Sequence, residues 1–231
     1  MKPHSETVAD LLRRAEQWHD EERWEEAIGA YREALQMDPE NAGIHFNLGL
    51  AFHETGRRAI AMAHYREAIR LRPDYAAAYL NLGTAQYENG QLEEALESFQ
   101  RALELEPQAD IYYNLGLVYQ ELERYPEAIA AFQKYLQFDQ DSDWASEARD
   151  NIAAMFPRLP TSPNGRMTGT VKWFNASRGF GFIAPDNGID EVFVHRKHLR
   201  TPRGGRLIEG QRVEFALEET ARGLQAIDVD G

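Results

Sequence analysis

Apolar positions follow two different periods along this chain of 231 residues. Up to about residue 156 they recur at helical spacing, as in Trp144, Ala148, Ile152 and Phe156, which lie four residues apart. From Thr168 onward, apolar residues alternate with others in short segments separated by Gly, Asn, Asp and Pro, which is typical of β-strands. The pattern therefore predicts a helical N-terminal part and a β-rich C-terminal part.

The helical part is an internal repeat. Its Leu-Gly pairs recur at offsets of 34 and 33 residues, at Leu48-Gly49, Leu82-Gly83 and Leu115-Gly116. Each pair is followed by an Ala and then, four residues later, by an aromatic residue: Ala61 and Tyr65, Ala95 and Phe99, Ala128 and Phe132. A weaker first copy supplies Ala27, Tyr31, Ala34 and Pro39. Small residues let two helices approach closely, and Pro ends the second helix, so each copy is expected to be one antiparallel helix pair. Such pairs stack into a solenoid, which the segment 142–156 would cap.

These residues resemble the tetratricopeptide repeat family over residues 8–156, with about four repeats and a capping helix. The pattern departs from the family at the ends and in one middle copy. Arg14-Ala15 replaces Leu-Gly in the first copy, Gln86 replaces an aromatic residue in the third, and Tyr135 and Gln140 replace Ala and Pro in the fourth.

The resemblance implies a concave face, formed by the first helix of each pair, that binds a protein or peptide. The residues expected to line this groove are Arg13, Asn47, Asn81, Asn114 and Tyr113. A column of amides could hold the backbone of an extended peptide, since each offers two donors and an acceptor. The alternative is that these Asn side chains only satisfy hydrogen bonds between helices or to water. The repeats contain almost no Lys, so the carboxylate-gripping ligand of the chaperone-binding type is not expected.

In the β-rich part, alternation separates rings from small residues. Phe180 and Phe182 share one strand face opposite Gly181 and Ile183, and Phe193 and His195 share a face opposite Val192 and Val194. The small lumen of a barrel of this length suits Val, Ile and Gly better than stacked rings, so the aromatic face is expected outside. An unstacked nucleobase is the flat partner that such a face suits. The alternative is a hydrophobic patch covered by a protein or by the repeats.

Residues 167 to about 230 closely resemble a cold-shock domain. The segments 167–175, 178–183 and 192–195 are similar to its first strand and its two ribonucleoprotein motifs. The resemblance implies a five-stranded oligonucleotide-binding barrel that binds single-stranded RNA or DNA with little sequence preference. It also implies a binding platform made of Lys172, Trp173, Phe174, Phe180, Phe182, Phe193 and His195. Arg178 replaces the usual Lys, Arg222 would border the patch, and Arg196 occupies a position where the family commonly has an aromatic residue, so it is expected to bind a base or a phosphate.

The net charge of −13 conceals a difference between the two parts. Residues 1–165 carry 15 basic and 29 acidic residues, whereas residues 166–231 carry ten and nine. Three prolines and a Gly between the parts indicate a linker. The predicted domains are a solenoid at 1–156, a linker at 157–166 and the barrel at 167–231. The acidic solenoid could compete with nucleic acid for the barrel, and equal affinity of the full chain and the isolated barrel would refute this hypothesis.

The sequence gives little support to catalysis. Gly179, Gly181 and Ala184 fit a dinucleotide-binding spacing, but a turn follows where a helix is required. His195 and His198 could suggest a metal, but alternation points them to opposite faces. With no cysteine and no run of about 18 apolar residues, we expect a cytoplasmic protein without a cofactor, metal or membrane partner.

The predicted function is binding of single-stranded nucleic acid, RNA over DNA, as an RNA chaperone or a translational or transcriptional regulator. The repeats would recruit a protein. The alternative is a protein scaffold in which the barrel is a docking module.

Overall fold

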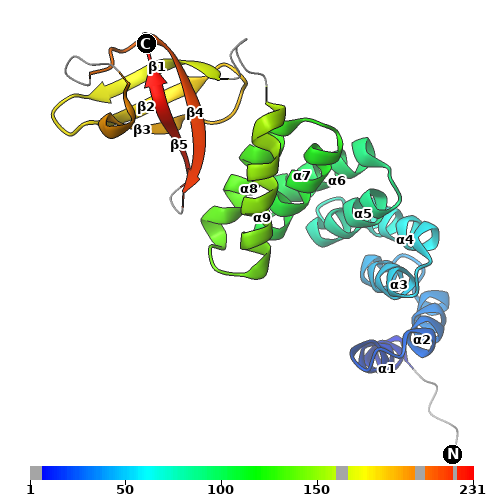
Figure 1. The fold of residues 1–231 in the computed structure, drawn as a ribbon. Helices are drawn as coiled ribbons and strands as arrows, with labels where there is room; N and C mark the ends of the chain where they lie inside the picture. Colours follow the sequence, from blue (N-terminus) through cyan, green and yellow to red (C-terminus); the bar gives the residue numbers. More distant parts are fainter. Residues whose placement is uncertain (1–6, 160–165, 201–205, 221–222) are drawn as a thin grey trace, which may run out of the picture. The chain divides into compact units, whose positions relative to one another are not determined.

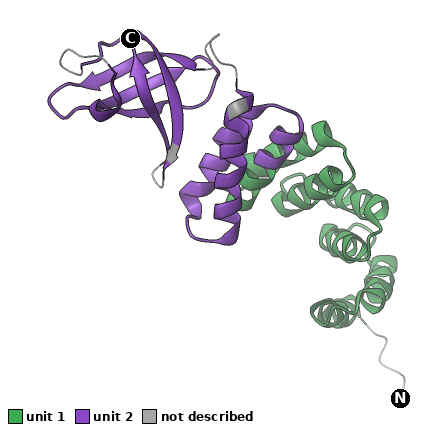
Figure 2. Ribbon diagram, in the orientation of Figure 1, with its two compact units in different colours: residues 1–114 green, residues 115–231 purple. Residues whose placement is uncertain are grey.

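The computed structural model describes residues 7–159, 166–200, 206–220 and 223–231, and within these ranges the chain forms nine α-helices followed by five β-strands (Figure 1). The helices are α1 (Val8–Asp20), α2 (Trp24–Met37), α3 (Ala42–Glu54), α4 (Arg58–Leu71), α5 (Ala76–Glu88), α6 (Leu92–Leu105), α7 (Ala109–Glu121), α8 (Tyr125–Phe138) and α9 (Asp143–Met155). The strands are β1 (Met167–Asn175), β2 (Phe180–Pro185), β3 (Val192–His195), β4 (Arg212–Thr220) and β5 (Gly223–Asp230). Contacts divide the chain into two compact units, residues 1–114 and 115–231, so the division falls within α7 (Figure 2).

Consecutive helices of the first unit pack as the predicted pairs, α1 with α2, α3 with α4 and α5 with α6. The α3–α4 and α5–α6 pairs each depend on a close approach between a glycine and a ring, whereas α1 has Ala15 at the corresponding position. A Cβ placed on Gly49 would lie 2.5 Å from Cε1 of Tyr65, and one placed on Gly83 would lie 2.8 Å from Cδ1 of Phe99. In the second unit, a Cβ placed on Gly116 would lie 2.7 Å from Cδ1 of Phe132. The spacing of Leu-Gly and aromatic residues thus encodes the packing in these three repeats.

The helix ends follow from local chemistry. Thr7 caps α1 in a reciprocal capping box with Asp10, and the hydroxyl of Ser142 caps α9 by accepting a hydrogen bond from the backbone N–H of Ala145 at 3.1 Å. Helices α4 and α6 end two residues before Pro73 and Pro107, as the steric restriction before proline requires.

Gln86 departs from the repeat pattern, and the buried face of α9 departs from the predicted one. The buried amide of Gln86, which replaces an aromatic residue, lies 2.6 Å from the hydroxyl oxygen of Ser98, so the polar group is satisfied inside the pair. In α9, Ala148 and Ile152 are buried as predicted, but Trp144 is 59% exposed. The buried face begins instead at Ala145, one residue and therefore about 100° further around the helix.

A histidine pair links α3 to α4. The Nδ1 atoms of His45 and His64 lie 3.1 Å apart, and Nε2 of His45 lies 3.2 Å from the carbonyl oxygen of Pro39. A carbonyl only accepts, so neutral His45 carries its hydrogen on Nε2 and Nδ1 of His64 donates. Burial lowers the pKa of His64, and the neighbouring His45 and Arg32 lower it further. Both effects favour the neutral form of His64.

The five strands form a closed barrel with the order β1-β2-β3-β5-β4. All pairs are antiparallel except β3 with β5, which is parallel. The interior is filled mainly by small aliphatic side chains: Val171, Ile183, Val192, Val194, Val213, Leu224, Ala226 and Val229, together with Phe215. The prediction of a five-stranded barrel with Val and Ile inside is therefore confirmed.

Helix α9 is followed by a short 3-10 helix, η1 (Phe156–Arg158), and Leu159 is buried. The predicted linker thus begins with a helical turn, and its residues 160–165 lie outside the described residues. Within the described ranges, no helix combines the length and hydrophobicity needed to cross a lipid bilayer.

Candidate nucleic-acid interface

Four rings lie together on the outer face of β1, β2 and β3. Their strand registers pair Trp173 with Phe182 and Phe182 with Phe193, while Phe180 faces His195. Directly opposed residues share a sheet face, so these pairs place the side chains on one side of the barrel. We call Trp173, Phe180, Phe182 and Phe193 the ring platform.

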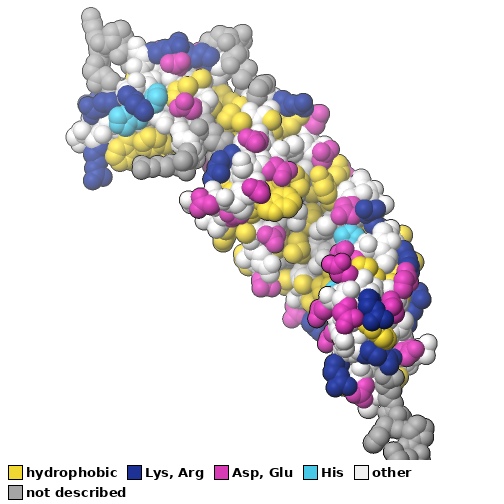
Figure 3. Space-filling view, turned by 60° about the horizontal axis from the view of Figure 1, so that its bottom comes forward, with side chains coloured by type: hydrophobic (Ala, Val, Ile, Leu, Met, Phe, Trp, Pro, Cys, Tyr) yellow, Lys and Arg dark blue, Asp and Glu magenta, His cyan; other side chains and the backbone are white. Residues whose placement is uncertain are grey.

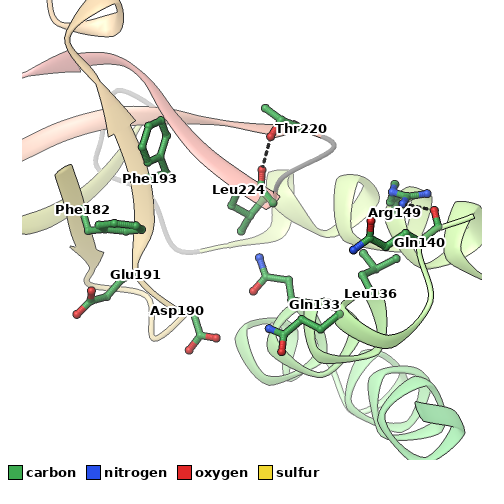
Figure 4. Close-up of a pocket in the computed structure, with 12 residues that line it drawn as sticks. Gln133, Leu136, Gln140, Arg149, Phe182, Asp190, Glu191, Phe193, Thr220 and Leu224 are labelled. Atoms are coloured by element: carbon green, nitrogen blue, oxygen red, sulfur yellow. Dashed lines mark hydrogen bonds between the residues drawn. The ribbon is translucent and has the colours of Figure 1, made fainter. Parts of the chain in front are cut away.

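The rings of the platform touch in a continuous chain. Centroid distances are 5.6 Å for Trp173 with Phe180 and with Phe182, and 5.9 Å for Phe193 with the same two rings. Figure 4 shows Phe182 and Phe193 on their neighbouring strands, in an edge-to-face arrangement with an interplanar angle of 77°. Trp173 is 40% exposed and the three Phe side chains are half-buried, so the cluster keeps ring surface open at the outside of the barrel. Exposed aromatic surface of this kind can stack on unpaired bases.

A β-bulge sets which residues of β1 point outward. Val171 pairs with Ile183, but the next register pair is Trp173 with Phe182, which leaves Lys172 as the extra residue. Val171 is consequently buried, while both Lys172 and Trp173 are exposed. The bulge therefore brings a cation and a ring to the surface side by side.

Phe174 lies differently from the other predicted platform residues. It is half-buried and pairs with Gly181, so it shares a face with Gly181 rather than with the ring platform. A Cβ on Gly181 would collide with the carbonyl oxygen of Trp173 and lie 2.8 Å from Cα of Phe174. Gly181 is thus needed for the close approach of β1 and β2 beneath the rings.

The predicted cations border the platform to different degrees. Lys172 lies 4.0 Å from Glu191, an acidic neighbour that sequence reasoning did not single out, and both side chains are about half exposed. Arg178 is exposed at the turn between β1 and β2, where its backbone N–H donates to Oδ1 of Asn175 at 2.9 Å. Arg196 is exposed next to the same turn, and Arg222 lies outside the described residues. Figure 3 shows Lys, Arg and His side chains beside a hydrophobic patch on the barrel, where a few acidic side chains also lie.

His195 faces Phe180 across β2 and β3 and is half-buried. Its Nδ1 accepts a hydrogen bond from the backbone N–H of Lys197 at 3.2 Å, which leaves Nε2 as its remaining ring nitrogen. Burial, and then the charge of Lys197, lowers the pKa of the nearby His198. Among the described residues, no three His, Cys, Asp or Glu side chains are grouped so that they could hold a metal ion.

The side chains predicted to line a protein groove are partly engaged within the helices. Asn47 lies near the hydroxyl of Tyr31, whose pKa burial raises to about 12 and Asn47 slightly lowers. Nδ2 of Asn81 donates to the carbonyl oxygen of Ala77 at 2.9 Å. The bond of Asn81 favours the alternative in which this amide satisfies a hydrogen bond within its own helix, although the amide keeps further hydrogen-bonding capacity.

The other predicted groove residues differ in exposure. The side chain of Arg13 is 80% exposed and pairs with Asp10 at 3.1 Å. Tyr113 is buried and so offers little surface to a partner, whereas Asn114 is half-buried. Repeat spacing identified the helix positions but not the local bonds of these side chains.

Comparisons with known proteins agree with this architecture. Residues 167–231 match the 'Cold-shock' DNA-binding domain family, residues 55–110 and 80–143 match the tetratricopeptide repeat family, and residues 18–56 match a TPR repeat family. The cold shock-like protein CspA of Vibrio cholerae serotype O1 is 52% identical over 64 residues, which are 28% of this chain and 91% of the relative.

Solved structures resemble the helical part. The crystal structure of MamA protein is similar with a TM-score of 0.56 and 27% identity, covering 64% of this chain and 86% of that one. The first TPR of Spaghetti (RPAP3) bound to HSP90 peptide SRMEEVD has a TM-score of 0.50 and 28% identity, covering 52% of this chain and 95% of that one.

The fold and these matches define a two-part protein, a tetratricopeptide-repeat solenoid joined to a cold-shock barrel. Through its C-terminal domain the chain belongs to the cold-shock protein family. Both families consist generally of binding modules, for nucleic acid and for proteins respectively, and the matched families include no catalytic one.

Proposed function

We propose that this protein binds single-stranded nucleic acid, RNA in preference to DNA, on the ring platform and binds a protein partner through its repeats. It would act as an RNA chaperone or as a translational or transcriptional regulator, without catalysis. The observation that carries the proposal is the four-ring cluster on the outside of the barrel, with Trp173 40% exposed. Bases can stack on these rings while Lys172 and Arg178 face phosphates.

The platform is tested by alanine variants of the full chain. Loss of a stacking ring costs about 1 to 3 kcal/mol per base, so Trp173→Ala and Phe193→Ala should each weaken oligonucleotide binding about five-fold to more than a hundred-fold. Trp144→Ala is the matched control, because Trp144 is another exposed Trp, 59% exposed, in helix α9. Affinities of a short oligouridine can be measured by fluorescence anisotropy. Unchanged affinity in both platform variants would refute the proposed site.

The preference for RNA is tested with the same full chain and two matched pairs of strands: a ribose and a deoxyribose strand carrying uracil, and a ribose and a deoxyribose strand carrying thymine. A protein that tells RNA from DNA at a given position does so through the 2′-hydroxyl. We expect tighter binding of the ribose strand with either base. Equal affinities would leave nucleic-acid binding intact and refute the RNA preference.

The proposal of a protein partner rests on the tetratricopeptide repeats. One similar solved structure, the first TPR of Spaghetti (RPAP3), is bound to a peptide of HSP90. In this chain, Asn81 and Asn114 lie on α5 and α7, each the first helix of its repeat, and are half-buried. A protein captured by the full chain after ribonuclease treatment, and lost with Asn114→Ala but retained with Phe193→Ala, would support binding at the repeats. Capture that depends on Phe193 instead would favour the scaffold alternative, in which the barrel is the docking module.

A further inference from the structure

Arg196, directly after β3, is hydrogen-bonded to the residue that precedes β2. It follows His195 directly and begins a short 3-10 helix, η2 (Arg196–His198). Its backbone N–H donates to the carbonyl oxygen of Gly179 at 2.7 Å. The residue is therefore fixed beside the turn that joins β1 to β2.

The guanidinium of Arg196 is bound to that turn. Its Nη2 donates to the carbonyl oxygens of Ala176 and Ser177, the second at 3.3 Å. These carbonyls belong to the residues between the two strands that carry Trp173 and Phe180. A planar guanidinium can donate to several acceptors at once, which suits it to hold two carbonyls of one turn.

Gly179 provides the space that this arrangement needs. A Cβ at this position would collide with Nε of Arg196 and lie 2.8 Å from its Cζ. Gly179 also has a φ of 75°, in the left-handed region that favours glycine. The guanidinium thus lies where any other residue at position 179 would place its side chain.

The braced turn has its own internal bonds. The backbone N–H of Gly179 donates to the carbonyl oxygen of Asn175 at 2.7 Å, and Oδ1 of Asn175 accepts from the backbone N–H of Arg178 at 2.9 Å. The turn therefore sets the positions of an exposed cation, Arg178, and of the ring of Phe180 that follows it. Any loosening of the turn would disorder both.

We propose that Arg196 is a positioning residue of the nucleic-acid interface, which braces the turn between β1 and β2 and contacts neither phosphate nor base. The proposal rests on the proposed function of the ring platform. It gives Arg196 a different role from the one expected from sequence, in which the guanidinium binds the nucleic acid directly. A phenylalanine at position 196 could cover the turn but could not donate to its carbonyls.

The test compares Arg196→Gln with Arg178→Gln in the full chain. Both variants lose one positive charge beside the same turn, but only Arg196 donates its side-chain hydrogen bonds to the turn. Two quantities are measured: the slope of log affinity for oligouridine against log salt, and the amide hydrogen exchange of Gly179 without nucleic acid. A phosphate contact contributes about −0.7 to the slope for a single strand. Exchange of the Gly179 amide reports opening of the turn.

For Arg196→Gln we expect faster exchange at Gly179, about three- to ten-fold weaker binding and an unchanged salt slope, since preorganisation is lost but no phosphate contact. For Arg178→Gln we expect unchanged exchange and a slope reduced by about 0.7. Arg196→Lys is the second variant if Arg196→Gln does not fold. It keeps the charge but not the planar fork, and it should show faster exchange with the slope retained.

Two results would overturn the proposal. A slope reduced by about 0.7 in Arg196→Gln, with normal exchange at Gly179, would make Arg196 a phosphate contact. Failure of the unchanged protein to bind oligouridine would refute the proposed function and with it the positioning role. Because exchange is measured without nucleic acid, the two failures can be distinguished.

Discussion

The fit between Gly83 and Phe99 can be tested by adding one methyl group. Gly83 lies within α5, and a Cβ there would lie 2.8 Å from both Cδ1 and Cε1 of Phe99 and 3.1 Å from its Cγ. Phe99 is 1% exposed, so its ring has no open space into which to move. Gly83→Ala therefore forces apart α5 and α6, the two helices of one repeat.

Two opposing effects determine the expected free energy of unfolding. Replacing Gly by Ala within a helix stabilises by about 1 kcal/mol, while overpacking a tight core costs about 1 to 3 kcal/mol. We expect Gly83→Ala to destabilise by up to about 2 kcal/mol. Gly29→Ala is the matched control, because Gly29 lies within α2 and its Cβ would meet nothing within 4 Å. The control should gain stability, so the two variants should differ by about 1 to 3 kcal/mol.

Urea denaturation of the full chain, followed by far-ultraviolet circular dichroism, measures the difference for the helical part. The effect of alanine's helix propensity cancels in the difference between the two variants, because both gain the same methyl group within a helix. Combining Gly83→Ala with Phe99→Leu should restore part of the lost stability by shortening the opposing ring. If Gly83→Ala proves as stable as Gly29→Ala, the ring is not packed against the glycine and the packing argument for every repeat is wrong.

Three further predictions concern charge. Glu191→Gln should strengthen oligouridine binding about two-fold and steepen its salt dependence, because it releases Lys172 from an ion pair 4.0 Å long; a salt titration measures both, and an unchanged slope would contradict the pairing. The pKa of His64 is lowered in the folded state, so below the ordinary value of 6.5 the unfolded chain binds more protons than the folded chain. The free energy of unfolding should therefore fall as the pH is lowered below 6.5. His64→Gln should flatten this pH dependence in denaturation curves measured between pH values of about 5 and 8. Hydrogen bonds from Ser142 and Tyr135 lower the pKa of Asp139 from 3.8 to about 2, so its contribution to stability should be present above pH 3.8 and lost as the pH falls through about 2. In thermal denaturation, Asp139→Asn should therefore destabilise the helical part at neutral pH and have no effect below about pH 2. An equal effect at both pH values would refute this role of Asp139.

Much of the fold follows from the sequence because its packing is periodic. The offset between Gly49 and Tyr65 recurs in the next two repeats, and each time the structure places the ring against the glycine. Alternation in β2 likewise predicted that Ile183 is buried and Phe182 is not. Such patterns are readable because they depend only on which side of a helix or strand a residue occupies.

Features that depend on a change of register or on a single contact were not predictable from periodicity. The bulge at Lys172 reverses the alternation of β1 and places Phe174 on the face opposite the ring platform. The bond from Asn81 to the carbonyl oxygen of Ala77 stays within one helix, and no spacing distinguishes such an amide from one that points into a groove. The contacts of Arg196 with the carbonyls of Ala176 and Ser177 arise from a distant strand in the same way.

Closure of the barrel has a consequence for solubility. Each of the five described strands has a neighbour on both sides, since β1 pairs with β4 as well as with β2. An open edge would present unpaired backbone groups beside exposed rings, and two chains could then join into a continuous sheet. Because the barrel formed by the described strands has no open edge, the rings can remain exposed to single-stranded nucleic acid without two copies of the protein pairing through their backbones.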